Sequence, residues 1–198
     1  MGAPWEGIYL PEMVSHPPAS SAQPTLATPR LLLRPFVPAD APAVTREVSD
    51  PPVAHQTLLP HPYPVGAAEA FIGRCAMEWE AGKAATWAIT RRDDMSLIGA
   101  ITVRMVRAHR TGDLGYWLAV PAWGQGFMTE AIDAVATAAF AGLGLHRLEA
   151  RLFPDNSASA RVLEKCGFRP EGTLRGALWK ENAPRDVLLY ARLVTDAR

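Results

Sequence analysis

Apolar and polar positions along the chain alternate between strand and helix spacing. The pattern predicts strands at 31–33, 86–90, 97–106, 114–120, 146–153, 173–179 and 187–193, and helices at 38–48, 67–81, 126–142 and 157–166. Because a helix separates 114–120 from 146–153, those two strands are expected to be parallel. Prolines at 51–52 and 60–64 bracket a predicted loop, and polar clusters predict turns at 92–94 and 111–113. The order indicates one α/β domain from residue 28 to 198 with a mixed sheet.

Residues 1–27 form a separate segment, rich in proline, serine and alanine, in which Glu6 and Glu12 are the charged side chains. The prolines argue against regular structure. An apolar cluster, Trp5, Ile8, Tyr9, Leu10 and Met13, is unusual for a solvated tail. The segment is therefore either a free extension or an arm that docks on the domain or on a second copy, as in a homodimer.

Composition excludes several classes of function. Lys+Arg and Asp+Glu both number 20, so no basic surface for nucleic acid is indicated. Cys75 and Cys166 are far apart, which disfavours a disulfide or a zinc site and suits reduced thiols in the cytoplasm. His55 and His61 lack metal-ligand spacing. No secretion signal is recognised, and the most apolar segment, 127–145, carries two acidic residues, which argues against a membrane span.

A glycine pair, Gly124 and Gly126, lies between the predicted strand 114–120 and the helix 126–142. Amides at a helix N-terminus favour an anion, because they lack intrahelical acceptors and the helix dipole is positive there. Taken alone, two glycines before a helix are more typical of an ordinary tight turn. A second motif runs from Asn156 through Ser159 to Gly167 and Phe168, one helix and one strand later, and it favours phosphate binding.

Together these motifs resemble the GNAT superfamily of acetyl-CoA-dependent N-acetyltransferases, and within it the branch that acetylates the N-termini of ribosomal proteins. The resemblance covers residues 28–194. It implies a mixed, mostly antiparallel, splayed sheet with helices on both faces. The family's diphosphate motif, Gln/Arg-x-x-Gly-x-Gly/Ala, falls on residues 123–128, where Trp123 and Met128 depart from the superfamily pattern but are usual for this branch.

The resemblance also implies the residues that bind acetyl-CoA. Main-chain donors would hold the diphosphate, from Trp123, Gly124, Gln125, Gly126, Phe127, Met128 and Thr129. Asn156 would hydrogen-bond the pantetheine arm, and Lys165 belongs to the same motif. Leu118 and Val120 would pair with the arm through their backbone, and the Val120 amide would polarise the thioester carbonyl.

Ser159 is the implied acid that protonates the leaving thiolate. Many superfamily members use a tyrosine as this acid, but Leu163 stands at that position. The glutamate base that some relatives carry would fall near Leu178, which cannot accept a proton. Asp113 is the remaining candidate base, acting directly or through water. Ser159 and Asp113 also have plain structural interpretations, as a first-turn helix serine and a turn residue.

His61, Tyr63 and Tyr116 are the candidates for lining the acceptor site, and no metal is expected. A weak base suits an amine of low pKa, so the acceptor is expected to be a peptide or protein α-amine. Two alternatives stay open: acetylation of a small amine such as a polyamine, an aminoglycoside or an amino acid, and a non-catalytic sensor that binds acyl-CoA.

Overall fold

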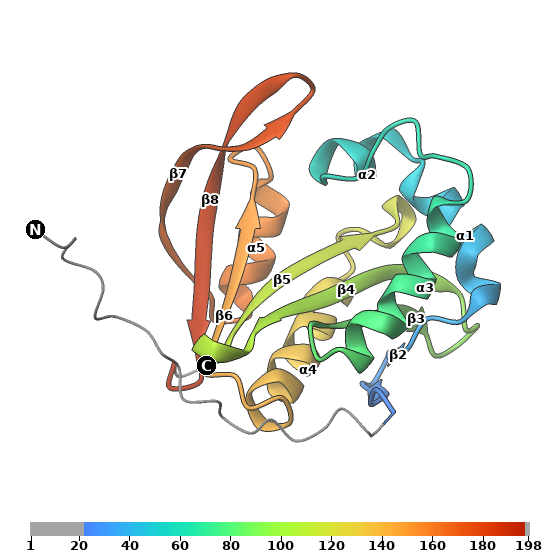
Figure 1. The fold of residues 1–198 in the computed structure, drawn as a ribbon, viewed down its shortest axis with the longest axis horizontal. Helices are drawn as coiled ribbons and strands as arrows, with labels where there is room; N and C mark the ends of the chain where they lie inside the picture. Colours follow the sequence, from blue (N-terminus) through green and yellow to red (C-terminus); the bar gives the residue numbers. More distant parts are fainter. Residues whose placement is uncertain (1–21, 197–198) are drawn as a thin grey trace, which may run out of the picture.

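The computed structural model describes residues 22–196, which form an eight-stranded sheet with the order β1-β2-β3-β4-β5-β6-β8-β7 (Figure 1). The strands are β1 (Leu26–Ala27), β2 (Leu31–Arg34), β3 (Ala84–Arg91), β4 (Leu97–Val106), β5 (Thr111–Leu118), β6 (Arg147–Leu152), β7 (Arg169–Lys180) and β8 (Ala183–Leu193). Only β5 and β6 pair in parallel; the other neighbours in this part of the chain are antiparallel. The predicted mixed sheet is confirmed.

Helices cover both faces of the sheet, as predicted (Figure 1). The helices are α1 (Ala41–Val48), α2 (Pro51–Gln56), α3 (Ala67–Glu80), α4 (Phe127–Ala141) and α5 (Ser157–Lys165), with 3-10 turns η1 (Pro38–Asp40), η2 (Arg107–His109) and η3 (Val120–Ala122). Helices α1 and α3 bury a small apolar cluster against one face. The larger core lies on the other face, where α4 and α5 pack apolar side chains onto the strands.

The sheet splits between β5 and β6. These strands pair only where residues 111–114 lie beside 147–150. Beyond that point β5 continues to pair with β4 as far as Leu118, and β6 continues to pair with β8 as far as Leu152. One backbone edge of residues 115–118 is therefore left without a neighbouring strand, and the two halves of the sheet diverge (Figure 1).

The structure corrects the start of the loop predicted between the prolines at 51–52 and 60–64, because residues 51–56 form helix α2. Pro51 and Pro52 occupy the first positions of α2, and Asp50 precedes them in extended conformation. Proline is favourable there, because the first amides of a helix have no intrahelical acceptor to lose. The prolines start a helix rather than prevent one.

The turn predicted at 111–113 is also wrong. Residues 111–113 are the start of β5, and the chain reverses earlier, at η2 and Arg110. Gly112 is needed inside the strand, because a Cβ there would lie 2.6 Å from the Val103 side chain and 2.8 Å from Leu145. At its other end β5 stops at Leu118, so Val120 lies in η3 and not in a strand.

The last residues of the predicted arm pack against the domain. Gln23 Nε2 donates to the Thr86 carbonyl at 2.8 Å, and Trp87 Nε1 donates to the Pro24 carbonyl at 2.8 Å. Leu26 and Ala27 then pair with β2 as β1. The apolar cluster at residues 5–13 lies outside the residues that the structure describes.

A buried ion pair secures the start of the α-helical layer. Arg34 donates to both carboxylate oxygens of Asp40 at 2.8 Å, and the Val37 amide donates to the same carboxylate at 2.9 Å. Burial would raise the pKa of the Asp40 carboxyl, but the hydrogen bonds and charge of Arg34 outweigh it and hold that pKa below its usual range. The ionised carboxylate therefore stabilises the fold above the ordinary Asp pKa of about 3.9, and this contribution is lost as the pH falls below it.

We expect Asp40→Asn to lower the free energy of unfolding by about 3 kcal/mol at pH 7, because it leaves the Arg34 charge half-buried and unpaired. Urea denaturation at pH 7 and at about pH 3.5 measures the effect, and the difference from wild type should shrink at the lower pH. The control is Asp93→Asn, which breaks an exposed ion pair with Arg91 and should cost less than about 1 kcal/mol. Equal costs for the two variants would contradict the prediction.

Candidate functional site

The loop between β5 and α4 presents a row of main-chain donors. Gly124 and Gly126 have φ of 74° and 79°, a left-handed conformation that favours glycine. Within residues 22–196, the amides from Gly124 to Thr129 donate no hydrogen bond. The Trp123 amide was predicted to bind the diphosphate too, but it donates to the Val120 carbonyl at 3.1 Å. Six of the seven predicted donors are thus available to an anion at the N-terminus of α4.

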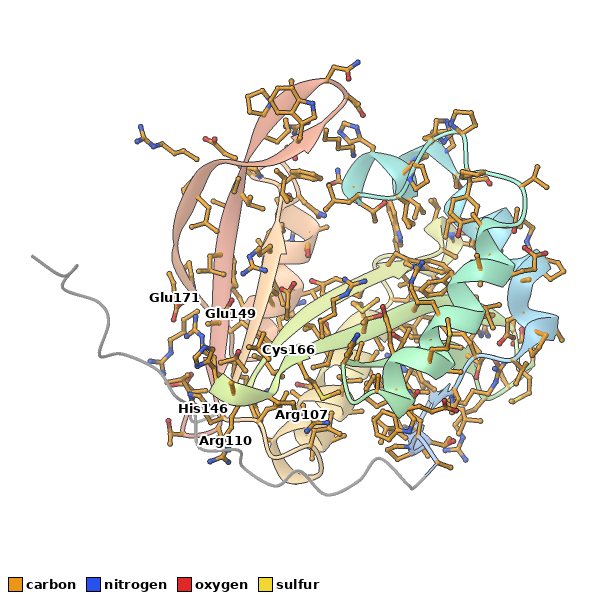
Figure 2. All side chains as sticks on the ribbon, viewed as in Figure 1. Arg107, Arg110, His146, Glu149, Cys166 and Glu171 are labelled. Carbon is orange, nitrogen blue, oxygen red and sulfur yellow. The ribbon has the colours of Figure 1, made fainter. Side chains whose placement is uncertain are left out.

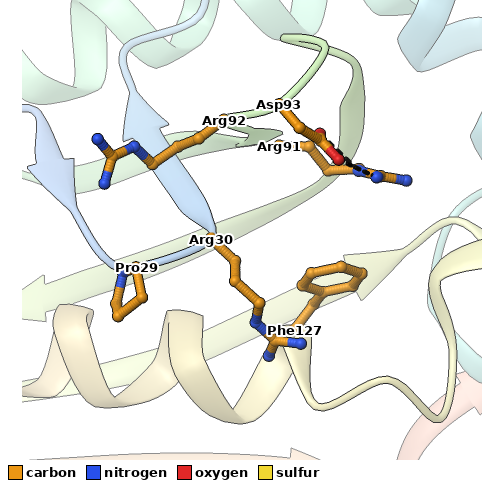
Figure 3. Close-up of a pocket in the computed structure, with 6 residues that line it drawn as sticks. All are labelled: Pro29, Arg30, Arg91, Arg92, Asp93 and Phe127. Atoms are coloured by element: carbon orange, nitrogen blue, oxygen red, sulfur yellow. Dashed lines mark hydrogen bonds and ion pairs between the residues drawn. The ribbon is translucent and has the colours of Figure 1, made fainter.

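Arg30, which the sequence reasoning missed, holds this loop from the turn between β1 and β2. Its Nη1 donates to the Gln125 carbonyl at 2.9 Å, its Nε lies 2.7 Å from Glu130 Oε2, and its guanidinium lies 4.5 Å from the centre of the Phe127 ring (Figure 3). A trans peptide directs its C=O and the following N–H oppositely. Binding the Gln125 oxygen therefore turns the Gly126 N–H away from Arg30.

A shallow depression of about 500 Å³ flanks the same loop (Figure 3). It is lined by Pro29, Arg30, Arg91, Arg92, Asp93 and Phe127. Its arginines already have partners: Arg91 pairs with Asp93, and Arg92 Nη1 donates to the Thr28 carbonyl at 2.9 Å. We therefore infer that the residues lining this depression support the loop and do not bind a ligand.

The N-terminus of α5 brings predicted residues together beside the split. The Asn156 side chain accepts a hydrogen bond from the Ser159 amide at 3.0 Å and so caps the helix. Ser159 Oγ lies 2.6 Å from the hydroxyl of Tyr116, which belongs to the unpaired part of β5. Lys165 is exposed in the last turn of α5, roughly 12 Å along the helix from its start, and stands apart from this group.

At and just after the end of β5, one main-chain amide has no acceptor and two main-chain carbonyls are already hydrogen-bonded. Trp123 Nε1 donates to the Leu118 carbonyl at 2.7 Å, and the Val120 carbonyl accepts from the Trp123 amide. The Val120 amide donates to no acceptor in the described part of the chain. This amide is consequently available to an oxygen that gains negative charge.

Asp113 lies apart from Ser159. Side chains alternate along a strand, so Asp113 points to the face of β5 opposite to Tyr116, roughly 10 Å away along the strand. Its Oδ1 lies 3.1 Å from Arg151 Nη1. Burial raises the pKa of the Asp113 carboxyl, although Arg151 and Arg104 lower it. Asp113 and Ser159 therefore both lie beside the split, but on opposite faces of the sheet.

Asp113 also belongs to a line of alternating charges across the second half of the sheet. Arg151 contacts Glu149 at 3.2 Å, Glu149 contacts Arg147 at 2.9 Å, and Arg147 donates to Glu171 at 2.8 Å. Figure 2 shows Glu149 and Glu171 near the same end of the sheet. The Arg151 contact at the end of this line engages one carboxylate oxygen of Asp113, Oδ1.

The three predicted acceptor residues do not form one group. Tyr63 lines an apolar cavity of about 280 Å³ between α1 and α3, and Trp117 lines the same cavity. Burial raises the pKa of the Tyr63 hydroxyl. His61 is exposed in the loop beside this cavity, and Tyr116 lies on the other face of the sheet. The sequence reasoning missed Trp117 as a cavity residue.

A second set of missed residues joins α2 to the hairpin of β7 and β8. Lys180 Nζ donates to the carbonyls of Ala54, at 3.0 Å, and Thr57, at 2.9 Å, at the C-terminus of α2, and also to the His55 carbonyl. His55 Nε2 lies 3.8 Å from Asp155, directly before the α5 cap. The contacts span the two halves of the split sheet. No sequence signal pointed to them, because α2 itself was not predicted.

Within residues 22–196, the structure contains no group of three or more His, Cys, Asp or Glu side chains that could hold a metal ion. None of the helices in this range has the length and apolar character needed to cross a membrane. Cys166 is fully buried beside α4, in agreement with a packing role.

Comparisons with known proteins identify the family. Residues 30–169 match the model of the acetyltransferase (GNAT) domain. The N-acetyltransferase YoaA of Bacillus subtilis is 34% identical over 169 residues, or 85% of this chain and 96% of the relative. The ribosomal-protein-serine acetyltransferase of Escherichia coli is 32% identical over 114 residues, or 57% of this chain and 63% of that protein.

Among solved structures, Mycobacterium smegmatis RimJ in complex with CoA-disulfide is 27% identical with a TM-score of 0.77, covering 87% of this chain and 88% of that one. The splayed sheet, the glycine loop before α4 and the capped α5 agree with this assignment. The chain therefore belongs to the GNAT acetyltransferase family and is an N-acetyltransferase.

Proposed function

We propose that this enzyme transfers the acetyl group of acetyl-CoA to the α-amine of a peptide or protein N-terminus, by direct attack while both substrates are bound. The observation that carries the proposal is the row of unpartnered amides from Gly124 to Thr129, at the end of β5 where it separates from β6. A relative of known structure is described in complex with CoA-disulfide, and another is named a ribosomal-protein-serine acetyltransferase.

In this proposal the loop amides hold the diphosphate of the coenzyme, and Asn156 and the open edge of residues 115–118 hold its pantetheine arm. The Val120 amide stabilises the oxygen that becomes negative when the thioester is attacked. The residues hold the coenzyme so that its acyl carbon is aligned with the amine. Alignment and a preorganised donor then supply most of the acceleration.

Proton transfer needs a donor for sulfur and an acceptor for nitrogen. Ser159 protonates the leaving sulfur, and the nitrogen loses its proton to Asp113. Because Asp113 lies roughly 10 Å along β5 from Tyr116, it acts through water. The sulfur gains one proton as the nitrogen loses one, so the reaction needs no further reactant.

The pKa of the acceptor decides how much amine is ready to attack. An α-amine with a pKa of about 7.7–8.0 is roughly one tenth neutral at pH 7, whereas a lysine side chain with a pKa of about 10.4 is neutral in about one molecule per few thousand. Asp113 is ion-paired with Arg151 and is not a strong base. The site therefore suits an amine that is already partly neutral.

A thiol-release assay with acetyl-CoA and a panel of amines tests the proposal. The panel contains a peptide with a free α-amine, its N-blocked form with one lysine, a polyamine, an aminoglycoside and free amino acids. We expect the α-amine peptide to react roughly 200- to 400-fold faster than the blocked peptide at pH 7, the ratio of their neutral fractions. Faster reaction of the lysine or of a small amine would contradict the acceptor, and coenzyme binding without turnover would support the sensor.

Asp113→Asn in the same assay tests the base. We expect kcat to fall by at least about tenfold with every acceptor, because the loss is in proton removal. Asp155→Asn is the control, since Asp155 is an exposed carboxylate that also pairs with an arginine. Wild-type kcat in Asp113→Asn would show that the amine attacks without a protein base.

Two further features belong to the proposal. Cys75 and Cys166 are buried thiols, which suits the reducing cytoplasm.

The apolar cluster at residues 5–13 would contact a second copy in a homodimer. Light scattering on the full chain measures the mass of the assembly directly.

A further inference from the structure

The hydroxyl groups of Tyr116 and Ser159 form a short contact across the split. Their oxygens are 2.6 Å apart, although the two residues are 43 positions apart in sequence. Tyr116 packs against the main core, and burial raises the pKa of its hydroxyl above the ordinary value. The phenol therefore stays protonated at neutral pH and carries a proton to donate.

The direction of this hydrogen bond decides what Ser159 can do. A serine hydroxyl has one proton and two acceptor sites, and its proton rotates to the available partner. Within residues 22–196, the Tyr116 hydroxyl contacts no other hydrogen-bond acceptor than Ser159 Oγ. If Ser159 donated to Tyr116, the proton of the half-buried phenol would have no acceptor among the described residues, which costs free energy. Donation from Tyr116 to Ser159 satisfies both groups.

We propose that Tyr116 is a positioning residue, whose hydroxyl donates to Ser159 Oγ and so leaves the Ser159 proton directed at the leaving sulfur of the thioester. The proposal rests on the function proposed above, in which Ser159 is the acid. The Ser159 amide is already bound by Asn156 at 3.0 Å, so the serine backbone is held and its hydroxyl rotor is the freedom that Tyr116 removes.

Accepting a hydrogen bond also makes the Ser159 hydroxyl a better donor, because successive hydrogen bonds polarise one another. In the reaction, the amine nitrogen forms its bond to the acyl carbon, and the carbon–sulfur bond breaks with its electron pair on sulfur. Sulfur takes the Ser159 proton. The serine oxygen regains a proton from solvent, so Tyr116 ends the cycle unchanged.

The test is Tyr116→Phe, which removes one oxygen and keeps the ring in the core. We expect kcat to fall about tenfold, with the KM for acetyl-CoA changed by less than about twofold. Tyr190→Phe is the matched control: Tyr190 is buried and its hydroxyl also bonds α5, through Glu164 at 3.2 Å, but away from Ser159. Thermal melting of both variants measures the shared structural cost, and Tyr190→Phe should keep wild-type kcat.

A double-mutant cycle separates positioning from structural support. If Tyr116 acts through Ser159, Tyr116→Phe will not lower kcat further in a Ser159→Ala background. Equal losses in both backgrounds would overturn the inference, because Tyr116 would then act independently of the serine. A wild-type kcat in Ser159→Ala would refute the proposed acid role of Ser159. A reduced kcat in Ser159→Ala together with a wild-type kcat in Tyr116→Phe would refute only the positioning role of Tyr116.

Site-specific 3-fluorotyrosine at position 116 keeps the inference testable if the phenylalanine variant does not fold. Fluorine makes the phenol a stronger donor with little change of shape, so kcat should rise in the Ser159 enzyme and stay constant in Ser159→Ala. An unchanged kcat in the Ser159 enzyme would overturn the inference.

Discussion

Gly126→Val is expected to weaken coenzyme A binding by about a hundredfold. Gly126 has a φ of 79°, where a residue with a side chain costs about 1–2 kcal/mol and a β-branched one more. A Cβ there would also lie 3.5 Å from Arg30 Nη2, so the larger valine crowds the residue that holds the loop. Relaxing this strain turns amides away from the diphosphate, each worth about 1.5–3 kcal/mol to a charged group.

Calorimetric titration of coenzyme A measures this effect, and Gly144→Val is its control. Gly144 is an exposed glycine with a φ of 67° in the loop that follows α4, and a Cβ at this position would have no atom within 4 Å. Both variants should lose similar stability through backbone strain, but only Gly126→Val should lose affinity. Comparable affinity in the two variants would show that the loop amides do not bind the coenzyme.

Ser159→Ala is expected to lower kcat by about a hundredfold, the lower range for losing a general acid, with little change in the KM for acetyl-CoA. The reason is that the leaving thiolate loses its proton donor, while the amides that bind the diphosphate and the Asn156 cap remain in place. Steady-state thiol release with a fixed α-amine peptide gives both constants.

Ser157→Ala controls for changes to the helix. Ser157 lies in the same first turn of α5, is exposed, and accepts only from Arg161 Nη1 at 3.2 Å among the described residues. It should keep wild-type kcat. If both serine variants lose activity equally, the serines support the helix N-terminus and Ser159 is not the acid.

Much of the fold could be predicted because its signals are local. Helix α4 follows from apolar spacing after a glycine pair, and the parallel pairing of β5 and β6 follows from the helix between them. The Asn156 cap is also a local feature, because the Ser159 amide that it binds is only three residues away. One failure was a local signal that was misread, and the other was a local signal that packing overruled. Pro51 and Pro52 start a helix once Asp50 is extended, and Gly112 sits inside a strand because Val103 and Leu145 leave no room for a Cβ.

The sequence by itself therefore determined the kinds of elements, their order, and the glycine loop and capped helix that identify the family. Only the tertiary structure decided how distant side chains meet. It set Arg30 against Gln125, Tyr116 against Ser159 and Lys180 against α2, pairs separated by 43 to 126 positions. It also set Asp113 and Ser159 on opposite faces of β5. Contacts of this kind depend on where strands separate and which elements pack against each face of the sheet, and no local spacing encodes either.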